Sequence, residues 1–281
     1  MLKKLKRITV ITLTFIFLIP GAYLFAQDGG GVNSTAMGLN IHGGLGYGQT
    51  VFGYINDADS TGDLGTGPGG AIDLGAMFNF NILAVSVNFV QANFSDMEFK
   101  ESDHTYKSEG DGYFRTLELL VGLKLFTEED DMGYTLLYGG YKMWNAERNI
   151  DKITLDGVSV PFTIEKYELE GDGWIAGYRD LSTFNLVAFS LALQTGFWFQ
   201  KMPISTVKMD GDKEDFKETD TAGLGVEFGL GVAFENMGLS VIGSVKVDIT
   251  ASVLDDMGGE DDIAGSGYSE FFITVTKDFA I

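Results

Sequence analysis

Residues 268–281, with the sequence YSEFFITVTKDFAI, carry apolar side chains at every second position. A period of two residues predicts a β-strand with one apolar face, because successive side chains of a strand point to opposite sides. We therefore expect the chain to end inside a strand that is apolar on one side. That face consists of Phe271, Ile273, Val275, Phe279 and Ile281, and only Lys277 interrupts it.

The same alternation recurs after residue 27 and predicts about ten strands. That part of the sequence contains no convincing helical stripe, so we expect an all-β protein. The dipeptide Asp156-Gly157 predicts a two-residue type I′ hairpin between the fifth and sixth strands. The predicted strands are residues 36–54, 72–80, 83–89, 112–126, 133–155, 158–178, 185–199, 223–234, 239–250 and 268–281.

Connections between these strands alternate between long acidic loops and short turns. The long loops are residues 56–69, 95–111, 201–220 and 255–265, and the short turns are the one near Asn81 and residues 127–131, 179–183 and 235–238. This pattern resembles that of bacterial outer-membrane β-barrels, whose long loops lie outside the cell and whose short turns lie in the periplasm. The resemblance implies an antiparallel, up-and-down transmembrane β-barrel of about ten strands. The alternative, a soluble β-sandwich, does not explain a uniformly apolar face on nearly every strand.

Residues 1–26 have the organisation of a secretory signal peptide. An apolar run over residues 8–18 is shorter than the roughly 20 residues that a membrane-spanning helix needs. It follows the basic residues Lys3, Lys4, Lys6 and Arg7 and precedes a Pro20-Gly21 break. We expect cleavage after Ala26 and a barrel domain over residues 27–281, with a retained membrane anchor as the alternative.

Composition and net charge limit the classes of molecule that the chain is expected to bind. The formal net charge is −21, and removal of residues 1–26 would take four of the 19 Lys and Arg residues and none of the 40 Asp and Glu residues, which leaves −25. Such a charge argues against nucleic acid as a partner. The chain has no Cys, which excludes a disulfide scaffold and a lipid-anchored cysteine. We expect a monomer in the cell outer membrane, with outer-membrane lipid, the barrel assembly machinery, periplasmic chaperones and an extracellular ligand or small solute as partners.

Charged residues of both signs recur on the polar face of the predicted strands, which would line the lumen. They are Asp73, Glu118, Lys124, Lys142, Glu227, Lys246 and Asp248. One interpretation is a network of charges and hydrogen bonds that fills and stabilises the lumen, since a ten-strand barrel is not much wider than the eight-strand kind that side chains fill. The other is a narrow channel for ions or small solutes, with Lys124 and Lys246 among the residues that set its selectivity.

Enzymatic motifs are lacking, so we expect no catalytic residues and no cofactor. The omptin proteases, which are ten-strand outer-membrane barrels with tall extracellular hairpins, resemble this chain in strand count. That family uses paired Asp residues and an Asp-x-His element, whereas here His104 directly follows Asp103 and His42 lies on the inward face of the first strand. The sequence also contains no Gly-x-Ser-x-Gly or His-Glu-x-x-His element. We therefore treat omptin-like proteolysis as a minor alternative.

The acidic loops are a further candidate site. Oxygen ligands for Ca²⁺ or Mg²⁺ are available from Asp210, Asp212, Glu214, Asp255, Asp256 and Asp261. Neither run has the spacing of an EF-hand, and solvated, like-charged loops are the simpler interpretation. A different alternative is a surface adhesin or ligand-binding protein that acts through these loops and the hairpin of the fifth and sixth strands. Aromatic residues on that hairpin, Tyr141, Trp144, Phe162, Tyr167 and Trp174, are expected in an interfacial belt.

Overall fold

The computed structural model describes residues 37–55, 65–80, 82–101, 104–125, 133–162, 165–186, 189–214, 218–255 and 261–280. The chain separates into two units, residues 1–33 and 34–281, and all of the described residues belong to the second. The predicted signal peptide, the predicted turn at residues 127–131 and Asp256 lie outside the described residues.

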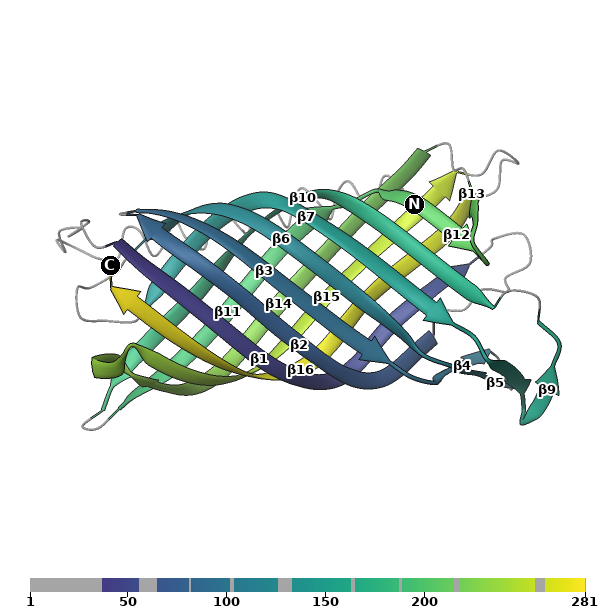
Figure 1. The fold of residues 1–281 in the computed structure, drawn as a ribbon, viewed down its shortest axis with the longest axis horizontal. Coiled ribbons are helices and arrows are strands. Elements are labelled where there is room, and N and C mark those ends of the chain that lie inside the picture. The colour runs from purple at the N-terminus through teal and green to yellow at the C-terminus, as the bar shows by residue number, and fades with distance from the viewer. Residues whose placement is uncertain are drawn as a thin grey trace. The chain divides into compact units, whose positions relative to one another are not determined.

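Ten antiparallel strands form a closed barrel (Figure 1). Each is hydrogen-bonded to the strand before and after it in the order β1, β2, β3, β6, β7, β10, β11, β14, β15 and β16. Their bounds are β1 Met37–Ile55, β2 Gly65–Phe80, β3 Leu83–Phe94, β6 Gly112–Leu125, β7 Tyr134–Asn149, β10 Lys166–Asn185, β11 Ser190–Lys201, β14 Glu218–Phe234, β15 Leu239–Asp255 and β16 Asp261–Ala280. The all-β prediction and the expected barrel of about ten strands are confirmed.

Closure depends on the pairing of the first strand with the last. β1 pairs with β16 continuously from Gly38 opposite Ala280 to Ile55 opposite Ile263, and its other edge pairs with β2. No barrel strand edge is therefore left open along this seam, as lipid requires of a spanning sheet. The strand predicted at residues 268–281 thus closes the barrel, and the two-sheet sandwich alternative is wrong.

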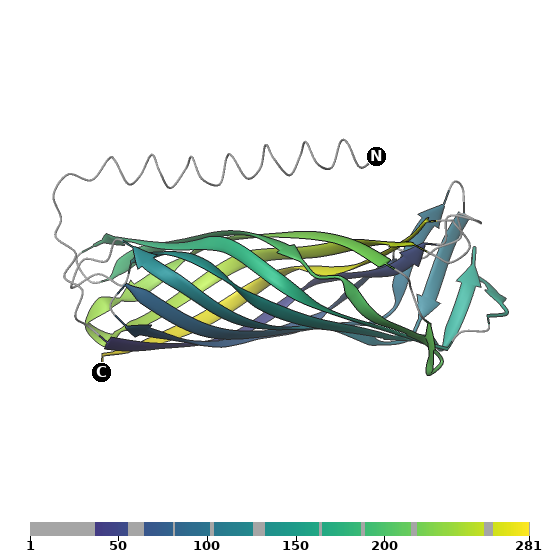
Figure 2. The same ribbon diagram turned by 90° about the horizontal axis from the view of Figure 1, so that it is seen from above.

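Six shorter strands extend one end of the barrel. β4 (Met97–Glu101), β5 (His104–Glu109), β8 (Lys152–Leu155) and β9 (Val158–Val160) pair in that order, while β12 (Ile204–Met209) pairs with β10 and with β13 (Asp212–Glu214). We call the four strands β4, β5, β8 and β9 the end sheet. Figure 2 shows the end sheet at the end of the barrel opposite to the chain's C-terminus. At that C-terminal end, the short 3₁₀ helix η1 (Glu235–Met237) connects β14 to β15.

Several predicted connections differ from the structure. Residues 95–111 and 201–220, predicted as loops, contain the strand pairs β4–β5 and β12–β13. The predicted turn at residues 179–183 is wrong, because β10 continues through them to Asn185. There β10 pairs with β11 throughout and with β7 as far as Leu181, so these residues hydrogen-bond as a strand. The predicted turns near Asn81 and at residues 235–238 are confirmed.

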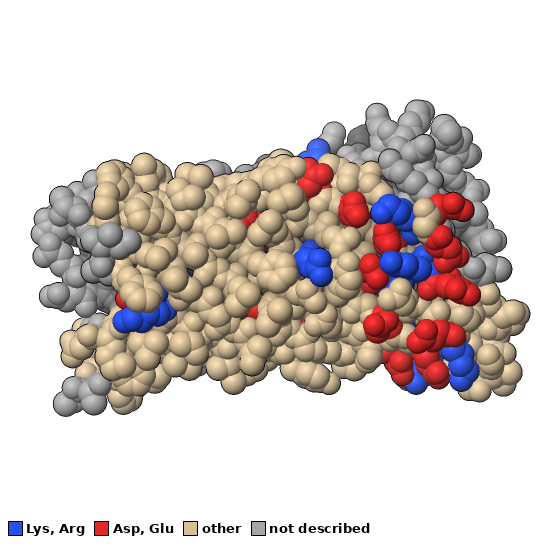
Figure 3. Space-filling view, viewed as in Figure 1, with Lys and Arg blue, Asp and Glu red and all other residues tan. Residues whose placement is uncertain are grey.

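The two faces of the barrel strands differ as the alternation predicts. Outward side chains such as Leu45, Val121 and Ile273 are 72%, 57% and 54% exposed, although they are apolar. Figure 3 shows few charged residues over the middle of the barrel and a dense group of both signs at the end that bears the end sheet. Such an apolar band matches a surface covered by hydrocarbon. Among the described residues no helix is long and apolar enough to cross a membrane.

Candidate functional site: the barrel lumen

Apolar side chains fill the lumen in three clusters. Near the end sheet, rings of Phe114, Trp144, Tyr268 and Phe272 form a tilted and edge-to-face stack with centroid separations of 5.9 to 6.3 Å. A second cluster includes Tyr138 and Trp198, and a third lies around Leu181 and Ile242. Aromatic rings of this size occupy most of the width of a small barrel. The lumen is therefore packed rather than lined by a continuous layer of small and charged residues.

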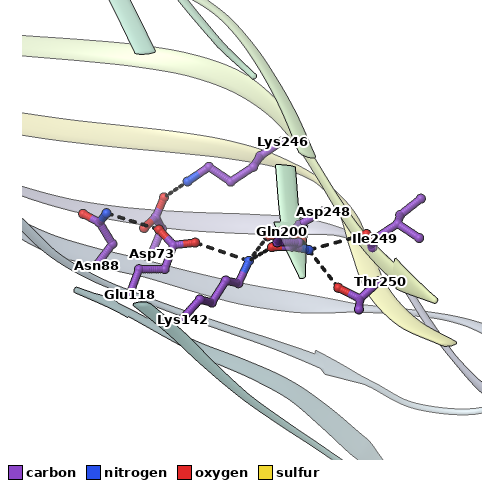
Figure 4. Close-up of polar contacts among 9 residues, drawn as sticks. All are labelled: Asp73, Asn88, Glu118, Lys142, Gln200, Lys246, Asp248, Ile249 and Thr250. Atoms are coloured by element: carbon purple, nitrogen blue, oxygen red, sulfur yellow. Dashed lines mark hydrogen bonds and ion pairs between the residues drawn. The ribbon is translucent and has the colours of Figure 1, made fainter. Parts of the chain in front are cut away.

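A buried hydrogen-bond network centred on Lys142 crosses the lumen (Figure 4). The Lys142 side chain on β7 is fully buried, and its Nζ contacts Asp248 of β15, Glu118 of β6 at 3.3 Å and the Gln200 Oε1 of β11 at 2.8 Å. Gln200 Nε2 in turn donates to Asp248 Oδ1 at 2.6 Å and to Thr250 Oγ1 at 2.7 Å. One cation is thereby shared by two carboxylates and an amide from three other strands, and we call this group the Lys142 network.

A second group of ion pairs, which we call the Asp73 network, lies in the same lumen and shares strand β15 with the Lys142 network. Lys246 Nζ of β15 is 2.5 Å from Asp73 Oδ2 of β2 and 3.8 Å from Glu227 Oε1 of β14. His42 Nε2 lies 3.5 Å from Asp73 Oδ1, and Arg179 Nε lies 3.4 Å from Glu227 Oε2. All five side chains are buried or mostly buried, so both signs of charge are compensated within the barrel.

Space between these side chains is small. One cavity, between His42, Asp73 and Tyr138, has a volume of about 10 Å³, and a neighbouring one beside Gln194 and Arg179 has about 30 Å³. A cavity needs roughly 10–15 Å³ to hold one water molecule, so these spaces fit about one to a few waters. Neither of these two cavities is large enough for a solute.

The seven residues predicted to line the lumen are distributed over both networks and one separate position. Asp73, Glu227 and Lys246 belong to the Asp73 network, and Glu118, Lys142 and Asp248 belong to the Lys142 network. Lys124 joins neither: its Nζ lies over the ring of Tyr134, 5.3 Å from the centroid.

Two network members were missed in the sequence. Arg179 was assigned to a turn, and Gln200 was just beyond the predicted seventh strand. Both have the inward parity of their strands, shared with the buried Ile175 and Trp198, and each lies one residue beyond the end of its predicted strand.

Glycines on the inward face leave room for the buried indoles. A Cβ added at Gly225 would lie 1.9 Å from the Trp198 ring, and one at Gly171 would lie 2.4 Å from Trp144 Nε1. Any larger residue at these positions would displace an indole that fills the lumen. The prediction that Trp144 belongs to the interfacial belt is wrong, because its side chain is only 4% exposed and faces the lumen. Tyr141 and Trp174 are 44% and 52% exposed on the outer face.

The acidic loop residues occupy separate places. Asp210 lies in the β12–β13 turn, where its Oδ1 accepts hydrogen bonds from the backbone N–H groups of Glu165 and Lys166 at 2.7 and 2.8 Å. Asp212 and Glu214 are the ends of β13, and Asp255 and Asp261 face each other in the β15–β16 register. Within the described part of the chain, no three His, Asp or Glu side chains come together as a metal site.

Each histidine lies beside a carboxylate. His42 contacts Asp73 inside the lumen, where Asp73 also binds Lys246. His104 Nδ1 lies 2.7 Å from Asp156 Oδ2 at the exposed tip of the end sheet, and Asp156 Oδ1 accepts the Thr105 N–H at 2.8 Å. Asp156 and Gly157 have φ angles of 50° and 83°, as the predicted type I′ turn requires. The Thr105 N–H and His104 hold the pKa of Asp156 below its usual range.

Solved structures that are similar to this chain include several outer-membrane barrels. The outer membrane protease OmpT from Escherichia coli is similar with a TM-score of 0.52 and 8% identity, over 90% of this chain and 99% of that chain. The translocator domain of the autotransporter NalP from Neisseria meningitidis has a TM-score of 0.38 and 10% identity, over 99% and 98% of the two chains. An outer membrane channel from Pseudomonas putida F1 has a TM-score of 0.35 and 9% identity, over 90% and 100%.

At these identities the likeness to OmpT concerns the fold alone. No protein-family model matches the chain, and no curated protein matches its sequence. The closed ten-strand sheet, its apolar outer band and this structural likeness agree with one another. The chain has the fold of the bacterial outer-membrane β-barrels.

Proposed function

We propose that the protein is an integral, non-enzymatic barrel of the outer membrane whose lumen is closed to solutes. In this proposal residues 1–26 are a signal peptide that is removed on export. The end of the barrel near η1 faces the periplasm, and the end sheet lies outside the cell. The outward apolar band and the dense charge at one end support this orientation, since the tall, charged ends of such barrels are the extracellular ones.

The observation that carries the closed-lumen proposal is the complete burial of Lys142. A fully buried ammonium group that contacts two carboxylates and an amide is held from three other strands at once. Moving it to open a path would leave Asp248 and Glu118 buried without their shared cation, which is costly. The ring stack of Phe114, Trp144 and Tyr268 fills the lumen independently of this network.

We further propose that the barrel serves as a rigid support for the end sheet, which would act as the binding surface. Arg148 of β7 ties the base of the end sheet to the barrel: its guanidinium donates to the Ser95 carbonyl at 2.9 Å and to the Ser108 carbonyl and hydroxyl at 2.8 and 3.0 Å. Asp156 ties the tip, through Thr105 and His104. Binding surfaces are commonly held in this way by a rigid scaffold.

Catalysis is not part of the proposal. In both His–carboxylate pairs the carboxylate has a second partner. Asp73 forms an ion pair with Lys246, and Asp156 accepts a hydrogen bond from the Thr105 N–H. A narrow channel is the second candidate, and it is favoured by the two water-sized cavities that lie among charged side chains.

Planar-bilayer conductance of the refolded chain separates the two candidates. We expect the wild type to insert and remain silent, and a Lys142→Ala, Lys246→Ala, Trp144→Ala triple variant to show conductance, because it loses the cations of both networks and a ring of the stack that also fills the lumen. Lys208→Ala, which removes an exposed lysine of β12, is the matched control and should stay silent. Discrete steps from the wild type, with an ion selectivity that changes in a Lys124→Glu, Lys246→Glu variant, would favour the channel and contradict a closed lumen.

A further inference from the structure

One buried carboxylate of the lumen has no partner. Glu270 of β16 is 1% exposed, and neither of its carboxylate oxygens has a hydrogen-bond partner. The other described carboxylates inside the barrel do have partners. They are Asp73 with Lys246, Glu118 and Asp248 with Lys142, Glu227 with Arg179, and Asp278 with Asn40. Glu270 is thus the exception among them.

The basic residue opposite Glu270 already has another partner. Lys246 is the register partner of Glu270 on β15, but its Nζ is directed to Asp73 Oδ2 and lies 5.5 Å from the centroid of the Phe272 ring. On the other side of β16, the register partner of Glu270 is Gly48 of β1. Gly48 has no side chain to bond the carboxylate, and an added Cβ there would lie only 2.9 Å from Glu270 Cγ. An ionised carboxylate buried without a partner is strongly disfavoured.

A second oxygen without a partner faces the lumen on the adjacent strand. Thr50 of β1 is fully buried and its Oγ1 has no hydrogen-bond partner. Thr50 lies two residues from Gly48, and therefore diagonally across the β1–β16 pair from Glu270. Side chains in such diagonal positions are close enough for long residues to approach one another. Buried oxygen atoms that lack hydrogen-bond partners therefore lie on two neighbouring strands, and both side chains face the lumen.

We propose that Glu270 and Thr50 bind a small monovalent cation, Na⁺, inside the barrel. Carboxylate and hydroxyl oxygens are ligands of hard cations, and one positive charge balances the one carboxylate that lacks a basic partner. Waters would complete the coordination. This cation stabilises the closed barrel and is independent of what the end sheet binds.

Thermal unfolding of the full chain in detergent micelles tests the site. The measurement compares NaCl with choline chloride at equal ionic strength, because choline is too large to replace Na⁺ between two fully buried oxygens. We expect the wild type to melt about 5 °C higher in sodium, as binding to the folded state alone predicts. Glu270→Gln should melt at one temperature in both salts, and above the wild type in choline, because the unbalanced charge is gone. Sodium-23 line broadening should be present in the wild type and lost in the variant.

Controls keep the proposal falsifiable. Thr50→Val keeps the carboxylate and should reduce the sodium shift, which provides a second test if Glu270→Gln does not fold. Glu118→Gln should lower the melting temperature in both salts but retain the shift. Equal melting of the wild type in the two salts would overturn the proposal in favour of a protonated carboxyl. A sodium shift that persists in Glu270→Gln would also overturn it, since the cation would then bind elsewhere, for example to the acidic loops.

Discussion

Two sets of Lys–carboxylate pairs in this barrel use the same residue types in different surroundings. Lys142 in the lumen is 0% exposed and contacts Asp248 and Glu118, whereas Lys208 on the outside of β12 is 32% exposed and lies 2.8 Å from Glu168. A buried charge cannot return to water when its partner is removed, but an exposed one can. We therefore expect the lumen pairs to decide stability and closure, and the outer pairs to contribute little.

The largest effect is expected for Lys142→Met, which removes the cation of the Lys142 network. Breaking a buried ion pair typically costs about 3–5 kcal/mol, because the remaining charges are left buried and uncompensated. The temperature at which the folded, fast-migrating form is lost on gel electrophoresis should fall accordingly. A double variant with Asp248→Leu should recover part of the loss. Near-wild-type stability of Lys142→Met would remove the distinction between the two sets of pairs.

An intermediate and local effect is expected for Arg148→Met at the junction between barrel and end sheet. The guanidinium makes three hydrogen bonds to Ser95 and Ser108, and bonds to a charged group contribute roughly 1.5–3 kcal/mol each. Hydrogen exchange should accelerate in β4, β5 and β8 while β14 to β16 stay protected. Uniform acceleration in all strands would show instead that the end sheet and barrel unfold as one unit.

A smaller effect is expected from acidification of the end sheet. Because the pKa of Asp156 is held below its usual range in the fold, the contact is present above the ordinary carboxyl pKa and is lost as the pH falls through the lower folded value. The protection of the Thr105 amide, measured as its exchange rate relative to the intrinsic rate at the same pH, should therefore decrease as the pH falls below the ordinary carboxyl range. Asp156→Asn should remove this step. A step that persists in the variant would assign it to another acid, such as Asp96.

The smallest effect is expected for Lys208→Met. Its ion pair with Glu168 is partly exposed and screened by salt, and such surface pairs often contribute nothing measurable. Melting should match that of the wild type, in low and high salt alike. A loss comparable to that of Lys142→Met would show that the outer charges act as a structural network.

The strands were largely predictable, whereas the cross-lumen contacts were not. The alternation in β14, β15 and β16 is strong because the outward side chains are apolar and exposed, whereas the inward side chains pack inside the lumen. Asp210-Gly211 is the same kind of turn dipeptide as Asp156-Gly157, with φ angles of 51° and 90°, but the many acidic residues around it favour a loop in the sequence prediction. By contrast, Asp73 and Lys246 are 173 residues apart and meet only through the barrel's closure and register. Local sequence carries no information on that pairing.

Thiol accessibility in the lumen tests the closed barrel most directly, since the chain has no cysteine of its own. Ser244, which is 2% exposed and lies 3.4 Å from Glu227 Oε1, would be replaced by Cys, with Ser159→Cys at the exposed tip of the end sheet as the reactive control. In intact proteoliposomes we predict that a charged thiol reagent leaves the Ser244→Cys protein unmodified from whichever side it is added, and that it modifies the Ser159→Cys protein when it is added on the side of the end sheet. Adding Lys246→Ala should make the lumen thiol reactive. Modification of Ser244→Cys in the otherwise wild-type barrel, at a rate comparable to the control, would contradict a closed lumen.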